Sequence, residues 1–130
     1  MKRTILLAGL LLLALPDAHA VKAGLYYCVP MHAAHLIRHE NGAVAEMSTD
    51  ISGVVQIIVI SDQRIDISDN RSDDSKLVNI VTNEMGGAIL GRSETRHFYM
   101  DDILHYFYGS TDASNTVAYA EDGMCSLFVH

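Results

Sequence analysis

Short apolar runs separated by polar turns make up most of the chain from Gly53 onward. The run GVVQIIVI (53–60) is rich in β-branched residues, and after the polar SDQR the segment IDIS (65–68) alternates isoleucine with polar residues. This alternation is typical of a β-hairpin. Further runs of the same kind are KLVNIVT (76–82), GAILG (87–91), TRHFYM (95–100), ILHYFY (103–108), NTVAYA (115–120) and MCSLFV (124–129).

Together with GLYYCV (24–29), these runs predict a mainly β fold of about seven to nine short strands. Many short strands at close spacing favour an antiparallel curved sheet, a small barrel or a sandwich. The stretch DDILHYFYG (101–109) also fits a helix between Asp101 and Gly109, but its aromatic residues favour a strand.

One segment departs from the strand pattern. Residues 30–40 contain good helix formers, with Pro30 where a first helical turn tolerates it and Asn41-Gly42 where a helix stop is expected. We therefore expect a short N-terminal helix near residues 30–40, so the fold can also be of the α+β class.

The N-terminus has the pattern of a secretory signal peptide. Lys2 and Arg3 precede an apolar run, and Ala18 and Ala20 form a small-residue cleavage pattern, so cleavage is expected after Ala20. The apolar run is shorter than the about 20 residues of a membrane span. We therefore expect a signal peptide at 1–20 and one exported globular domain at 21–130, located in the periplasm or secreted, with no stable membrane span after cleavage.

The composition narrows the choice of partner. Without residues 1–20 the chain keeps seven Lys and Arg against fifteen Asp and Glu, a formal net charge of −8. A chain this acidic repels phosphate backbones, so nucleic-acid binding is not expected.

Two cysteines, Cys28 and Cys125, lie near the two ends of the exported domain. In an oxidising compartment such a pair is expected to form a disulfide, here between the first and last strands. Redox-active pairs have C-x-x-C spacing, which this chain lacks.

Three histidines, His32, His35 and His39, lie at spacings of three and four residues in MHAAHLIRH. On a helix their rings converge on one face, opposite the apolar stripe. Imidazole binds Zn²⁺, Cu²⁺ or Ni²⁺, and a short helix needs a further donor from elsewhere to complete such a site. A solvated helix face and a pH-responsive surface are the alternatives. The candidates for the further donor are His97, His105 and His130.

An acidic stretch, DISDNRSDDS (66–75), provides oxygen atoms of the kind that Ca²⁺ prefers. Its spacing does not match a calcium-binding loop, so we interpret it as an acidic turn between two strands.

The segment RHFYMDDILHYFY (96–108) predicts an aromatic hairpin. If Asp101-Asp102 is a two-residue turn, Phe98, Met100, Ile103, His105 and Phe107 face the core. Tyrosines on the other face suit a ligand or partner surface. The residues predicted for that surface are His97, Tyr99, Tyr106 and Tyr108.

The chain has no G-x-S-x-G, H-E-x-x-H or C-x-x-C spacing and no phosphate-binding glycine loop. We therefore expect a non-enzymatic domain that binds an envelope protein or a small molecule without a cofactor. A divalent-metal-binding protein using Zn, Cu or Ni at the histidine cluster is the first alternative, and a small hydrolase is the second.

The ends of the exported domain, YYC (26–28) and GMC (123–125), resemble those of small bacterial envelope proteins, among them the bacterial C-type lysozyme inhibitors. The resemblance implies a compact β-barrel that inserts an S-G-x-x-Y loop into a lysozyme cleft. Here SG (52–53) is followed by VVQ, without the tyrosine, so no site residue is transferred.

Overall fold

The computed structural model describes residues 21–82 and 87–129, and every regular element in them is a β-strand. The signal peptide expected at 1–20 lies outside the described residues. The strands are β1 (Gly24–Arg38), β2 (Val44–Ser48), β3 (Gln56–Ile60), β4 (Arg64–Asp69), β5 (Ser72–Thr82), β6 (Ile89–Arg92), β7 (Arg96–Met100), β8 (His105–Thr111) and β9 (Val117–Val129).

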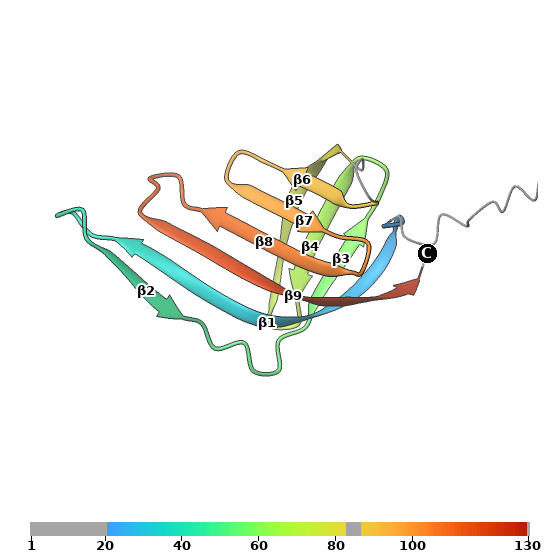
Figure 1. Ribbon diagram of the computed structural model, residues 1–130, viewed down its shortest axis with the longest axis horizontal. Coiled ribbons are helices and arrows are strands. Elements are labelled where there is room, and N and C mark those ends of the chain that lie inside the picture. Colours follow the sequence, from blue (N-terminus) through green and yellow to red (C-terminus); the bar gives the residue numbers. More distant parts are fainter. Residues whose placement is uncertain (1–20, 83–86, 130) are drawn as a thin grey trace, which may run out of the picture.

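Eight of these strands close into an antiparallel barrel (Figure 1). Consecutive strands pair from β3 to β9, and β1 closes the ring because it pairs with both β3 and β9. The remaining strand, β2, lies outside the ring and pairs with β1. The prediction of a mainly β fold is confirmed, and the small barrel is the correct one of the three expected architectures.

Strand β1 changes its neighbour along its length. Residues 24–28 pair with β3, whereas residues 34–38 pair with β2. On its other side β1 pairs with β9 along nearly its whole length, with a bulge between Pro30 and His32. Residues 34–38 of β1 therefore form a projecting sheet with β2 and the adjoining parts of β9 and β8, seen at the left of Figure 1.

The helix predicted for residues 30–40 is wrong, because residues 30–38 continue β1 and residues 39–40 lead into the following turn. Its backbone pairs with β2 on one side and β9 on the other, and this pairing outweighs the weak helix preference of the residues. Asn41-Gly42 lies in the turn of the β1–β2 hairpin, with Gly42 in the left-handed region at φ 81. Pro30 lies at the bulge, where a missing N–H is tolerated.

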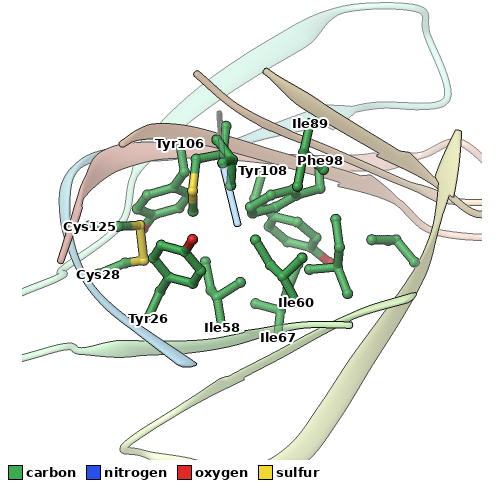
Figure 2. Close-up of a cluster of buried hydrophobic side chains, with 14 residues drawn as sticks. Tyr26, Cys28, Ile58, Ile60, Ile67, Ile89, Phe98, Tyr106, Tyr108 and Cys125 are labelled. Carbon is green, nitrogen blue, oxygen red and sulfur yellow. A yellow bond between two sulfur atoms is a disulfide. The ribbon is translucent and has the colours of Figure 1, made fainter. Parts of the chain in front are cut away.

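The barrel interior is a packed apolar core. Side chains such as Ile58, Phe98 and Tyr106 are almost completely buried and point toward one another in Figure 2. Cys28 and Cys125 lie directly opposite each other on β1 and β9 and form a disulfide. The predicted link between the first and last strands is therefore confirmed.

Besides the extension of β1 through the expected helix, the predicted strands differ from the observed ones mainly at β2 and β9. The runs 115–120 and 124–129 are parts of one strand, β9, since Glu121, Asp122 and Gly123 between them continue the pairing with β1. Strand β2 was not predicted, because AVAEMS (43–48) lacks an apolar run long enough to be noticed.

Candidate functional site

Two neighbouring acidic residues of β9 point to opposite sides of the barrel wall. Glu121 is 2% exposed and lies among buried side chains. Asp122, the next residue, has 29% of its side chain exposed on the outer side. Successive side chains of a strand alternate between its two faces, so β9 has one carboxylate inside and one outside.

The inner carboxylate is surrounded by hydrogen-bond donors. The Tyr106 hydroxyl donates to Glu121 Oε1 at 2.7 Å, and the Tyr119 hydroxyl and Gln56 Nε2 donate to Oε2, the latter at 3.3 Å. Burial, together with the charge of Glu121 and its hydrogen bonds, raises the pKa of Tyr106 and Tyr119 far above the usual range. Both hydroxyls therefore remain protonated donors at neutral pH.

The outer carboxylate lies between two histidines from the neighbouring strands. Asp122 Oδ1 is 2.8 Å from His32 Nδ1 on β1, and Asp122 Oδ2 is 3.1 Å from His105 Nε2 on β8. Partial burial acts to raise the pKa of Asp122, but the hydrogen bonds from the two imidazoles outweigh it and the pKa is lowered. The carboxylate is therefore held in position by a histidine on either side.

A groove of about 570 Å³ lies beside this outer carboxylate, lined by β1, β2, β8, β9 and the loop that follows β2. A groove of this size fits a small molecule or a few side chains. The residues that line it are Met31, His32, Ala33, Ala34, Glu46, Ser48, Thr49, Ile51, Phe107, Ala120, Glu121 and Asp122.

The floor of the groove exists because small side chains meet across three strands. Ala34 on β1 lies directly opposite Ser48 on β2 and Ala120 on β9. The next row contains larger groups, since Asp122 lies opposite both His32 and Phe107. Side chains of one face form rows across a sheet, and a row of small residues beside a row of large ones leaves a depression.

The groove has an acidic character. Glu46 and Asp122 line it from strands on opposite sides of β1, and none of the described residues that line it is Lys or Arg. The remaining surface is mostly small or apolar, with Met31, Ile51 and Phe107 as its large apolar side chains. A group with positive charge and an apolar part matches this surface best.

The loop at the rim of the groove (residues 49–55) is anchored by the turn between β4 and β5. Asn70 Nδ2 donates to the Gly53 carbonyl at 2.9 Å, and the Arg71 guanidinium donates to the carbonyls of Asp50, at 3.1 Å, and Ser52. Asp69 Oδ1 accepts the backbone N–H of Arg71 at 2.7 Å, as expected for an acidic turn. The turn expected within DISDNRSDDS (66–75) is present but comprises only Asn70 and Arg71, since the flanking residues belong to β4 and β5. This turn also positions the loop.

The structure does not bring the three clustered histidines together. On a strand, residues three apart point to opposite faces. His32 contacts Asp122 on the outer face, whereas His35 contacts Thr49 and the Tyr119 ring. His39 lies exposed beyond the end of β1. Of the further donors considered, His105 shares the carboxylate of Asp122 with His32, and His130 lies outside the described residues.

No group of three or more His, Cys, Asp or Glu side chains in residues 21–82 and 87–129 is arranged to hold a metal ion. The binding of Zn, Cu or Ni by His32, His35 and His39 stays a prediction.

The predicted faces of the aromatic hairpin are wrong for β8. Met100 pairs with Tyr106 rather than with Ile103, because the connection is longer than two residues and includes Leu104 at φ 64. This shift of three positions exchanges the two faces of β8. Tyr106 and Tyr108 therefore lie in the core (Figure 2), and Phe107 is outside at the groove. On β7, the predicted outward positions of His97 and Tyr99 are confirmed.

Sequence reasoning missed Glu46, Glu121 and Asp122. The acidic pair lies in AYAEDGMC (118–125), between two runs that predict separate strands, so the pattern predicts a polar turn there. An alternating pattern extended through this gap would have placed Glu121 and Asp122 on opposite faces. The partners of Asp122 come from β1 and β8, far away in sequence, and only the barrel brings them together.

Comparisons with protein-family models, with curated proteins and with solved structures find no match for this chain. In the part of the chain that the structure describes, there is no helix of the length and apolar character needed to cross a membrane.

Proposed function

We propose that this protein is an exported, non-enzymatic binding domain whose ligand presents a positively charged group next to an apolar one. The single observation that supports the proposal most is the groove, in which two outward carboxylates adjoin a small and apolar floor without a Lys or Arg among the described lining residues.

The chemistry of the two carboxylates suits an ammonium or guanidinium group. Asp122 is positioned by His32 and His105, and each of its oxygens can accept a further hydrogen bond. Glu46 lines the groove from β2. Hydrogen bonds between charged partners are stronger than those between neutral ones, and a carboxylate fixed in advance loses little freedom on binding.

The apolar part of the ligand is expected to lie against Phe107 and Met31. Phe107 is 44% exposed and Met31 is 55% exposed, and both line the groove. The face of an aromatic ring attracts cations as well as apolar groups, so Phe107 serves both parts of such a ligand.

The confirmed disulfide and the signal-peptide pattern at the N-terminus support a location in the periplasm or outside the cell. The acidic composition supports a cationic partner there and disfavours nucleic acid.

Three matched probes test the proposal by amide chemical shifts of the isotope-labelled, oxidised protein. Phenethylammonium, neutral phenethyl alcohol and anionic phenylacetate share a benzyl group and differ in charge. We expect phenethylammonium to shift the amides of Ala34, Ala120 and Asp122 most, the alcohol less and phenylacetate least. Equal shifts for the cation and the anion, or shifts elsewhere on the barrel, would contradict the proposal.

Two alanines of β9 provide a matched pair of variants. Ala120→Leu fills the floor of the groove and is expected to abolish the shifts caused by phenethylammonium. Ala118→Leu adds the same group two residues away, outside the groove lining, and is expected to preserve them. If both variants respond alike, the groove is not the binding site.

A further inference from the structure

Strand β2 offers an open backbone edge next to the groove. Barrel closure gives β1 and β3 to β9 a neighbour on each side, whereas β2 pairs only with β1 among the described strands. The strand is exposed, with Val44 59% and Met47 54% accessible. An unpaired edge of this kind accepts an extended chain as an additional strand.

The pairing of β2 identifies which backbone groups face outward. The Thr49 N–H donates to the Ala33 carbonyl at 3.1 Å, so these residues form a hydrogen-bonded pair of the β1–β2 ladder. Antiparallel ladders alternate, so Ala45 and Met47 also direct their N–H and C=O groups toward β1. The outward groups then belong to Val44, Glu46 and Ser48.

Two of the three residues whose backbone groups point to the open edge also line the groove. Glu46 and Ser48 line the groove with their side chains and direct their backbone groups to the open edge. Residues directly opposite each other in a ladder share a face of the sheet. Every second side chain of an added strand would therefore lie on the groove side of β2, beside Glu46.

We propose that the edge of β2 binds an extended segment of a partner protein that has Lys or Arg at alternating positions. The proposal rests on the proposed function and specifies its ligand, because the charge of Glu46 and Asp122 calls for basic residues on the groove side. A second copy of this chain fits less well. Antiparallel pairing of two β2 strands about their centre would place one Glu46 opposite the other, and like charges in that position are destabilising.

The probe for this proposal is a short synthetic peptide of alternating lysine and threonine. Amide hydrogen exchange is measured on the isotope-labelled, oxidised protein with and without the peptide. Bound peptide is expected to slow exchange of the outward Val44, Glu46 and Ser48 amides by about tenfold or more. The Ala45 and Met47 amides already bond to β1, and their exchange is expected to change much less.

A proline variant of the protein tests whether a backbone N–H at the open edge of β2 binds the peptide. Val44→Pro removes one outward N–H, and proline is tolerated at the first residue of a strand. Val44→Thr keeps the N–H and the branched shape. We expect Val44→Pro to weaken peptide binding by about tenfold, the effect of one hydrogen bond, and Val44→Thr to leave it unchanged. Val44 does not line the groove, so phenethylammonium should bind both variants equally.

Each outcome decides between the proposals. If phenethylammonium binds but the peptide leaves the Glu46 and Ser48 amides unprotected, the strand-addition proposal is overturned and the proposed function stands. If neither probe binds in the groove, the proposed function falls as well. If these amides are already protected in a dimer without peptide, a second copy occupies the edge and the partner-protein proposal is wrong. If Val44→Pro fails to fold, the exchange pattern of the unmodified protein still decides.

Discussion

Glu121 and Asp122 are adjacent in the chain and have the same charged group, yet they lie in opposite environments. Glu121 accepts hydrogen bonds from Tyr106, Tyr119 and Gln56 and is 2% exposed. Asp122 is held by two histidines that are themselves partly exposed, beside an open groove. The first carboxylate is surrounded by its own protein, and the second is accessible to a ligand.

This difference predicts that the inner carboxylate of β9 contributes to stability and that the outer one contributes to the proposed binding. Removing the Tyr106 hydroxyl leaves the buried Oε1 of Glu121 without its hydrogen bond, which is destabilising in the interior. An exposed ion pair contributes little to stability, since water replaces the lost partner. We therefore expect changes inside the barrel to affect folding, and changes at the groove to affect the ligand.

Removal of the disulfide should have the largest effect on stability. The double variant Cys28→Ser, Cys125→Ser opens a link between residues 97 apart. The chain-entropy model predicts a loss of roughly 4–5 kcal/mol in the free energy of unfolding, measurable by urea denaturation. The groove lies outside the linked core, so folded protein should bind phenethylammonium as before. Unchanged stability would show that the packing of β1 on β9 suffices without the link.

Gly123 provides the next largest effect, again on the inner side. A Cβ on Gly123 would overlap the Val29 carbonyl oxygen and lie 2.8 Å from the Pro30 Cα, and neither backbone atom can move alone. Gly123→Ala is expected to cost about 2–3 kcal/mol by overpacking β1 against β9. Gly109→Ala is the control, because its nearest contact, Phe107 Cε1 at 3.4 Å, is ordinary. Equal thermal midpoints for both variants would refute the close approach.

A titration to alkaline pH should distinguish the buried tyrosines, because their pKa is raised. Burial is the main cause that raises the pKa of Tyr26, Tyr106, Tyr108 and Tyr119 in the folded protein. Their raised pKa favours the folded state fully below the ordinary value of about 10, and this stabilisation is lost as the pH rises through the folded pKa. Absorbance titration should therefore show four of the six tyrosines ionising late, together with unfolding. Reversible ionisation of all six near pH 10 would contradict this.

The strands and the disulfide were predictable because their signals are local or depend on simple pairing. Alternating runs such as 53–60 and 65–68 predict strands without knowledge of their neighbours. The only two cysteines of a chain that is expected to be exported can pair only with each other. The helix prediction for 30–40 failed because its signals are ambiguous. Proline occurs in first helical turns and at strand bulges, and Asn-Gly occurs at helix ends and in hairpin turns. The strand conformation of this segment depends on β2 and β9, which the local pattern does not contain.

The candidate site was harder to predict for the same reason. His32 was noticed for its spacing from His35 and His39, but its actual partner is Asp122, 90 residues away. Tyr106 and Tyr108 were assigned to the surface because the length of the preceding connection could not be read from the sequence, and an odd shift reverses the face. The depression itself depends on Ala34 meeting Ala120, which only the barrel register determines.

A paired measurement on two conservative variants tests the separation of stability from binding most directly. Tyr106→Phe removes one hydroxyl from the inner carboxylate, and Asp122→Asn neutralises the outer one. For each, the free energy of unfolding is measured by urea denaturation, and the affinity of the folded protein for phenethylammonium by chemical-shift titration.

We predict that Tyr106→Phe lowers the free energy of unfolding by roughly 1–3 kcal/mol and leaves the affinity unchanged. Asp122→Asn should lower stability by less than about 1 kcal/mol and weaken phenethylammonium binding about tenfold. The reverse pattern, with binding lost in Tyr106→Phe and preserved in Asp122→Asn, would contradict the assignment of the outer groove as the binding site.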